Sequence, residues 1–110
     1  MLTVNAFNKK DIDEILKGLC VVEVSGESCA NCLTLMPILD RLVGKRTDCK
    51  LVHIEADATT VDLIQRFEVR QAPTILITKD GEVIERVVGF QPEEILEIWL
   101  DDKLDSLKNI

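Results

Sequence analysis

The sequence of 110 residues lacks both a long hydrophobic run and a basic, apolar leader at its start. Crossing a bilayer takes about 20 consecutive apolar residues, and no run approaches that length, so we expect no transmembrane segment. The first seven residues contain no basic segment followed by an apolar stretch, so we expect no secretory signal peptide. These absences predict a cytoplasmic protein, and structural disulfides are rare in that compartment.

Positive charge is also scarce. The chain has 13 Lys and Arg residues against 20 Asp and Glu, which gives a net charge of -7. Nucleic-acid phosphates and anionic membrane surfaces would repel such a chain, so we expect neither as a partner. Repeats, low-complexity tracts and linkers are absent as well. We therefore expect one domain over residues 1–110, acting as a monomer.

The apolar pattern of the chain predicts alternating strands and helices. Strands are expected at residues 2–4, 20–24, 50–55, 74–78 and 82–88, and helices at residues 10–17, 32–43, 60–67 and 93–104. This order, βαβαβαββα, predicts an α/β fold with a mixed central sheet, helices on both faces and a hairpin at one edge. In such sheets chemistry collects beyond the C-terminal ends of the parallel strands.

Two cysteines follow the second strand at that position. Cys29 and Cys32 form a C-x-x-C pair at the start of a predicted helix, whose N-terminus favours a thiolate. Cys29, on the loop side, is the expected nucleophile, and Cys32 the expected resolving thiol. Zinc is the alternative, but it needs a second pair of ligands, and Cys20, Cys49 and His53 do not have ligand spacing. We therefore expect no metal and no cofactor.

Other polar residues lie within the predicted strands. Glu23 interrupts an apolar run, and an acid there is costly to bury, so it should have a raised pKa and a function unless it reaches solvent at a sheet edge. Cys20 and Cys49 begin two strands that should be parallel neighbours, at the end opposite the C-x-x-C pair. We expect them to be buried free thiols, with a second disulfide as the alternative. His53 is expected to be a packed core residue.

Several segments together resemble the thioredoxin family. In its active-site segment an acid is followed six residues later by C-x-x-C and then by a helix that contains proline, as in residues 23–39 here. Residues 69–74 resemble the cis-proline loop of the family, residues 80–83 its hairpin turn, and residues 88–90 the segment with its substrate-groove glycine. The resemblance extends from Leu2 to about Leu104. It implies the thioredoxin fold and an enzyme that reduces or exchanges protein disulfides.

The resemblance also implies roles for individual residues. Glu23 would exchange protons with the resolving cysteine, so that the catalytic residues would be Cys29, Cys32 and Glu23. A cis bond would precede Pro73, and the substrate-binding residues would be Ser28, Ala30, Asn31, Ala72, Pro73 and Gly89. Near the acid, where thioredoxins have a lysine, this chain offers His53 or Glu55. The partners would be disulfide-containing proteins and a reductase or other dithiol reductant.

The chain also departs from the family. Thioredoxins have Trp-Cys-Gly-Pro-Cys, whereas this chain has Ser28, Ala30 and Asn31 at the three variable positions, and Ser25 replaces a second tryptophan. The missing proline removes a rigid element that helps to set the redox potential. Two other functions stay open: a binding module that uses the groove without turnover, and a carrier of a metal or cluster. The two intact cysteines and the acid favour the enzyme.

Overall fold

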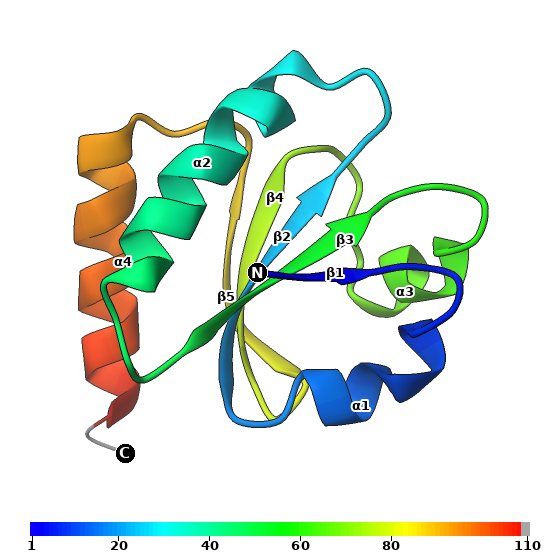
Figure 1. Cartoon of the computed structure of the whole chain (residues 1–110). Coiled ribbons are helices and arrows are strands. Elements are labelled where there is room, and N and C mark those ends of the chain that lie inside the picture. Colours follow the sequence, from blue (N-terminus) through cyan, green and yellow to red (C-terminus); the bar gives the residue numbers. More distant parts are fainter. Residues whose placement is uncertain (109–110) are drawn as a thin grey trace.

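A computed structural model describes residues 1–108, which form a five-stranded sheet between two layers of helices (Figure 1). The strands are β1 (Leu2–Val4), β2 (Leu19–Ser25), β3 (Lys50–Glu55), β4 (Thr74–Lys79) and β5 (Glu82–Val88). Their order in the sheet is β1-β3-β2-β4-β5. The strands β1, β2 and β3 are parallel, and the antiparallel hairpin of β4 and β5 extends the sheet beside β2. The predicted α/β fold with a mixed sheet is confirmed.

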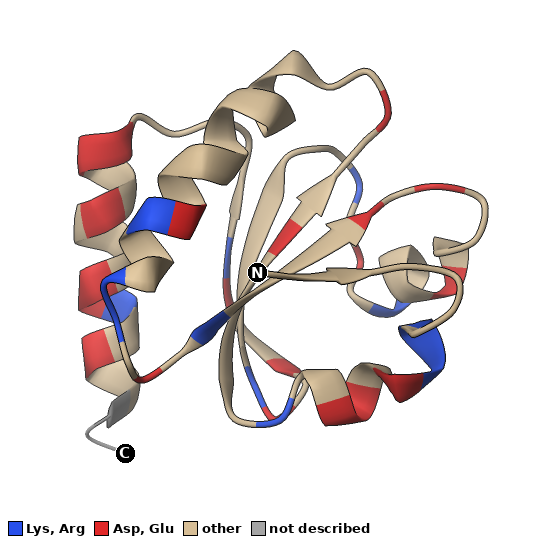
Figure 2. Ribbon diagram, viewed as in Figure 1, with Lys and Arg blue, Asp and Glu red and all other residues tan. Residues whose placement is uncertain are grey.

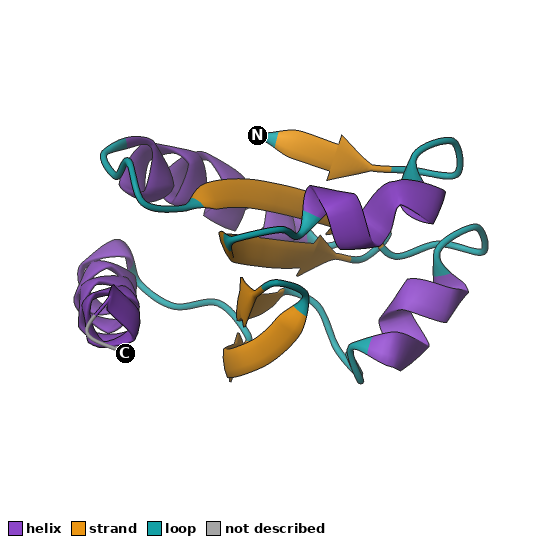
Figure 3. Ribbon diagram, turned by 90° about the horizontal axis from the view of Figure 1, so that it is seen from below, coloured by secondary structure: helices purple, strands orange, loops and turns teal. Residues whose placement is uncertain are grey.

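The helices cover both faces of this sheet. They are α1 (Ile12–Ile15), α2 (Ala30–Gly44), α3 (Val61–Arg66) and α4 (Glu93–Lys108), and a 3₁₀ turn (Lys9–Asp11) precedes α1. Figure 3 shows α1 and α3 on one face and α2 and α4 on the other. No helix in this part of the chain is both long and apolar enough to cross a membrane.

The predicted elements are present. The strand β2 is one residue longer at each end and β4 one residue longer at its C-terminal end, and the larger differences lie at helix ends. The helix expected over residues 10–17 is shorter, because residues 9–11 form a 3₁₀ turn and the α-helix ends at Ile15, just before Gly18 with its positive φ. The helix α2 begins at Ala30, two residues before its predicted start. The last helix continues past its predicted end, where Leu107 still packs against the core.

The central strand β2 determines which side chains reach the α2 face. Side chains alternate between the two faces of a strand. Val22 and Val24 pack into the apolar cluster on the α1 and α3 face, whereas Val21 packs into the cluster on the α2 and α4 face. Glu23 and Ser25 have the same parity as Val21, so they lie on the α2 face.

The register of the parallel strands adds two further polar residues to that face. Glu23 is the partner of His53 and Ser25 the partner of Glu55 in the pairing of β2 with β3. These four residues occupy the C-terminal halves of two adjacent parallel strands, and α2 begins just beyond the end of β2. The fold therefore gathers a polar group beneath the N-terminus of α2.

Ion pairs join α2 and the loop after it to α4. The acidic residues of α4 face basic residues at the far end of α2 (Figure 2). Lys45 lies 3.0 Å from Glu97, and the guanidinium of Arg46 lies 2.8 Å from Asp101 and 2.7 Å from Asp105. The exposed pair of Lys45 and Glu97 contributes about 0–1 kcal/mol. The side chain of Arg46 is only 13% exposed, so its two pairs with α4 are better shielded from solvent.

Candidate active site

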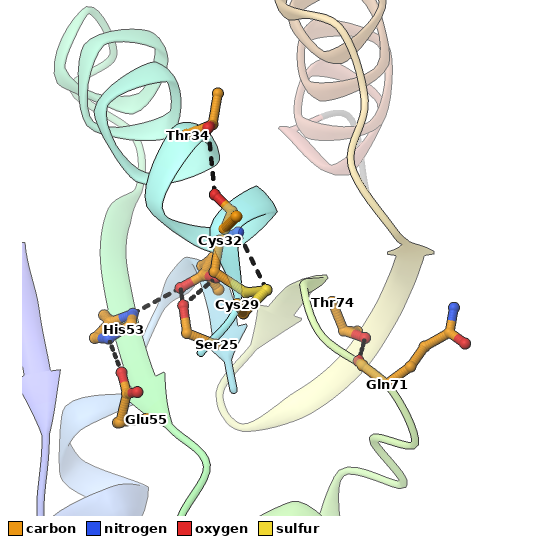
Figure 4. Close-up of a disulfide and its surroundings, with 10 residues drawn as sticks. Ser25, Cys29, Cys32, Thr34, His53, Glu55, Gln71 and Thr74 are labelled. Atoms are coloured by element: carbon orange, nitrogen blue, oxygen red, sulfur yellow. Dashed lines mark hydrogen bonds and ion pairs between the residues drawn. A yellow bond between two sulfur atoms is a disulfide. The ribbon is translucent and has the colours of Figure 1, made fainter. Parts of the chain in front are cut away.

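The two cysteines of the C-x-x-C pair lie at the start of α2 (Figure 4). Ser28, just before them, has a left-handed backbone with a φ of 54°, which turns the chain from the loop into the helix. Cys29 is the N-cap residue, and a disulfide joins it to Cys32, with the Cα atoms 5.3 Å apart. Cys29 is partly exposed, whereas Cys32 is only 3% exposed. The predicted placement of the pair, one sulfur at the loop side and one inside the first turn, is confirmed.

Two features of the helix end favour negative charge on the Cys29 sulfur. The backbone N–H of Cys32 donates a hydrogen bond to Sγ of Cys29, at 3.2 Å. The same sulfur lies at the positive end of the dipole of a 15-residue helix. Both interactions favour the thiolate over the thiol once the disulfide is reduced.

The loop before β4 lies against the cysteine loop. The peptide bond between Ala72 and Pro73 is cis, as the resemblance implied. A Cβ atom on Gly26 would lie 3.2 Å from the Cβ of Ala72, so a glycine at position 26 permits this close approach. The N–H of Gly89 donates to the carbonyl oxygen of Pro73, at 2.8 Å. The structure therefore brings the β2–α2 loop, the cis-proline loop and Gly89 together.

The residues predicted to bind substrate surround this junction. Four are exposed, Gly89 is partly exposed and Pro73 is buried; the exposed ones are Ser28, Ala30, Asn31 and Ala72. The hydroxyl of Thr74 donates to the carbonyl oxygen of Gln71, at 2.6 Å, within the cis-proline loop (Figure 4). The exposed positions leave the surface beside Cys29 open to a large molecule.

Glu23 is completely buried, which excludes the alternative that it reaches solvent at a sheet edge. The hydroxyl of Ser25 donates to its two carboxylate oxygens, at 2.6 and 2.9 Å. One of these oxygens also lies 2.6 Å from Nδ1 of His53. The buried acid is therefore hydrogen-bonded on two sides.

His53 connects this buried carboxylate to a second one. Its Nε2 lies 3.0 Å from a carboxylate oxygen of Glu55, and its side chain is 12% exposed. The hydrogen bond to Glu23 raises the pKa of His53, and Glu55 adds to the effect, whereas burial opposes it. The interpretation of His53 as a packed core residue missed these partners. The sequence does contain a signal for these contacts. His53 and Glu55 are two residues apart, so they lie on the same face of a strand that was expected to be parallel to the strand of Glu23.

A hollow of about 430 Å³ opens beside the disulfide on the same side as His53. Both cysteines line it, together with Ser25, His53 and Glu55, and Leu33 and Met36 of α2 form an apolar wall. The cis-proline loop does not contribute to its lining. The hollow and the loop therefore flank the disulfide on different sides, as Figure 4 shows for His53 and Glu55 against Gln71 and Thr74.

The other two cysteines lie at the opposite end of the sheet. Cys20 is buried, Cys49 is partly buried, and both are free thiols. Burial raises the pKa of Cys49 to about 11 and also raises the pKa of Cys20. Among the described residues, no three His, Cys, Asp or Glu side chains cluster in a way that could hold a metal ion.

Comparisons with known proteins agree with this site. The profile of the family described as Thioredoxin matches residues 1–102. The thioredoxin of Staphylococcus haemolyticus is 33% identical over 95 residues, 84% of this chain and 88% of that protein. The thioredoxin of Bacillus subtilis is 32% identical over 98 residues, 88% of this chain and 93% of that protein.

The fold of this chain is also similar to a solved structure, that of a mutant thioredoxin from Halobacterium salinarum. It superimposes with a TM-score of 0.75 at 27% identity, and the match covers 92% of this chain and 88% of the other. This chain therefore resembles thioredoxins in sequence over most of its length. It also has a mixed five-stranded sheet, a disulfide at a helix N-terminus and a cis-proline loop. The chain belongs to the thioredoxin family, and it is a thiol–disulfide oxidoreductase with a Cys29–Cys32 pair.

Proposed function

We propose that Cys29 is the nucleophile, Cys32 the resolving thiol and Glu23 the proton acceptor in the reduction of protein disulfides. The observation that carries this assignment is the difference between the two sulfurs. Cys29 is partly exposed and accepts a hydrogen bond at the helix N-terminus, whereas Cys32 is buried. An exposed, stabilised thiolate suits attack on a large substrate.

The reaction begins with the reduced dithiol. The Cys29 thiolate attacks one sulfur of a target disulfide, a bond forms between Cys29 and that sulfur, and the other target sulfur leaves as a thiolate. Cys32 then gives its proton to the Glu23 carboxylate and attacks Sγ of Cys29. The mixed disulfide breaks, the second target sulfur leaves as a thiolate, and both target thiolates take protons from water. Two electrons have passed from the dithiol to the target, and the Cys29–Cys32 disulfide remains.

The junction beside Cys29 suits an extended segment of a protein substrate. Ser28, Ala30 and Asn31 are exposed around the nucleophile, and Ala72 is exposed on the neighbouring loop. An extended peptide can pair with backbone groups of such a loop as an added strand. We place the segment there, over Ala72 and Pro73 and against Gly89.

Restoring the dithiol requires an electron donor, which we take to be a reductase or a small dithiol. The proposal places the chain in the cytoplasm as a monomer. Its net charge of -7 does not suit nucleic acids or anionic membranes, and the free thiols Cys20 and Cys49 suit a reducing compartment.

Alkylation of the reduced protein with iodoacetamide, followed by peptide mass mapping at several pH values, tests the roles of the sulfurs. We expect Cys29 to react first near neutral pH and Cys32 to react more slowly. Cys20 and Cys49 are internal controls, because burial raises the pKa of both thiols and should keep them unmodified near neutral pH. Modification of Cys32 before Cys29 would reverse the assignment of nucleophile and resolving thiol.

A further inference from the structure

A continuous row of polar groups leads from the buried acid to the surface. Glu23 is completely buried, its carboxylate lies 2.6 Å from Nδ1 of His53, and Nε2 of His53 lies 3.0 Å from Glu55. The Glu55 side chain is 44% exposed. Each ring nitrogen of a single imidazole therefore meets a different carboxylate, one without solvent contact and one in solvent.

We propose that His53 is a positioning residue that carries protons between Glu23 and solvent through Glu55, and so renews Glu23 as a base in each cycle. The inference rests on the proposed role of Glu23 as proton acceptor for Cys32. A carboxylate with no solvent contact cannot exchange protons directly with water, so a proton taken from Cys32 needs a second group to remove it. The row of three side chains provides that route.

The transfer balances at both ring nitrogens. Glu23 holds the proton that it has taken from Cys32. The neutral imidazole with its proton on Nε2 accepts that proton at Nδ1 and releases the Nε2 proton to Glu55, which passes it to water. Glu23 is again a carboxylate, and the imidazole is neutral with its proton now on Nδ1, the tautomer that the reverse transfer converts back to the Nε2 form. During reduction of the disulfide, the same steps run in reverse and return a proton to Cys32.

The hollow beside the disulfide explains why this route stays open during catalysis. His53 and Glu55 line the hollow together with Ser28 and Cys29 at its edge by the β2–α2 loop, whereas Ala72, Pro73 and Gly89 do not line it. A protein substrate seated over the cis-proline loop leaves the hollow on the other side of the sulfurs (Figure 4). Water can therefore reach Glu55 and His53 while the mixed disulfide is present.

Within residues 1–108, few other charged or titratable groups face His53. On β2 the facing residue is Glu23, and on β3 itself it is Glu55. At the start of α2, Cys29 and Cys32 both line the same hollow. On β1 the register partner is the uncharged Thr3, with Met1 and its amino group at the edge. The two carboxylates hydrogen-bond to the ring, and both raise the pKa of His53.

A two-phase experiment tests the proposal on the full chain. The reduced protein is mixed with a small aromatic disulfide whose released thiol is coloured. The first thiol appears when Cys29 attacks, and the second appears when Cys32 resolves the mixed disulfide. Rates of both phases are measured from about pH 5 to pH 9, the range in which imidazoles titrate.

We expect His53→Gln to slow the second phase relative to the first by about 10-fold near neutral pH. This is less than the roughly 10²–10⁴-fold typical of direct general acid–base catalysis, because His53 acts through Glu23. The inflection that His53 gives to the pH profile of the second phase should disappear. Glu55→Gln should slow the second phase less. Glu82→Gln is the control, because it removes one exposed carboxylate at the start of β5 and should leave both phases unchanged.

Rescue by imidazole separates proton transfer from a merely structural role. The hollow of about 430 Å³ beside His53 can admit the free base, so added imidazole should accelerate the second phase of His53→Ala and not that of the native chain. If both His53 variants keep the native ratio of phases and the native pH profile, the proposal is wrong. If urea unfolding shows that the His53 variants do not fold, Glu55→Gln becomes the test. A native rate of the second phase in Glu55→Gln would then overturn the proposal.

Glu23→Gln distinguishes this inference from the function on which it rests. If Glu23→Gln leaves the second phase unchanged, the proposed role of Glu23 fails. If Glu23→Gln slows the second phase while the His53 and Glu55 variants do not, the role of Glu23 stands and the proton route through His53 is overturned.

Discussion

At the scale of single residues, the unusual feature of this protein is a buried glutamate that is paired with a histidine. An acid within the apolar run at residues 20–24 is costly to bury, which predicts a functional role for it. The structure confirms that the side chain of Glu23 is buried. The sequence could not show which group pairs with it. His53 lies 30 positions further along the chain, and only the register of β2 against β3 places it opposite Glu23.

Glu23→Gln should change stability in opposite directions at low and high pH. Glu23 raises the pKa of His53, so the pair stabilises the fold fully below the unfolded pKa of about 6.5 and loses this contribution as pH rises through the folded pKa. At low pH the variant should therefore be destabilised, by roughly 1–3 kcal/mol for a lost charge-assisted hydrogen bond. At high pH it should be stabilised, because a buried charge is removed beside a neutral ring.

Urea unfolding of the native chain and of Glu23→Gln, at pH values below and above the pKa of His53, measures the difference in their free energies of unfolding. Ser106→Ala, on the exposed face of α4, is a control whose stability difference should not depend on pH. If Glu23→Gln changes the free energy of unfolding in the same direction at every pH, the charge of His53 does not depend on Glu23.

At the scale of helices and strands, β-branched runs and breakers predicted the sheet well. The bounds of β3 and β5 match the prediction, because a buried apolar pattern marks β3, and the turn after β4 and Gly89 delimit β5, whose side chains alternate between exposed and partly buried. The first helix was predicted too long, because the apolar spacing does not distinguish the 3₁₀ turn at Lys9–Asp11 from the short α-helix that follows it. The α2 start was placed late, because the cap at Cys29 depends on the sulfur, which accepts from the N–H of Cys32.

The first turn of α2 should set the redox potential. The Ala30-Asn31 spacer lacks the proline that stiffens the ring in typical thioredoxins, so closing the disulfide costs more chain entropy. We expect a potential above the value of about -270 mV typical of thioredoxin. Asn31→Pro should lower it, because proline is tolerated in the first turn of a helix.

Equilibration of each protein with glutathione buffers, followed by quantification of reduced and oxidised forms, gives the potential. Asn31→Ala is the matched control, because it removes the same side chain without restricting the backbone, and it should leave the potential near the native value. A native potential below that of thioredoxin, or an equal shift in both variants, would contradict the role of the spacer.

At the scale of the whole molecule, the fold places two different surfaces beside the Cys29–Cys32 disulfide and keeps the other two cysteines far from it. The cis-proline loop and Gly89 lie on one side of Cys29, the hollow with His53 and Glu55 lies on another, and Cys20 and Cys49 occupy the far end of the sheet. The alternation of β2 and β3 sends four polar side chains toward α2 and apolar ones toward α1 and α3. The proposed substrate surface and the proposed proton route therefore approach the sulfurs from different sides.

Cys29 and Cys32 should together let this chain turn over as a disulfide reductase. Reduction of insulin disulfides by a chemical dithiol, followed by the turbidity of the released chains, tests this expectation most directly. Catalytic amounts of the native chain should accelerate the reduction, and Cys29→Ser should fall to the rate of the dithiol alone, whereas Cys49→Ser should keep the native rate. A native chain no faster than the dithiol alone, or a Cys29→Ser variant as active as the native chain, would contradict the account.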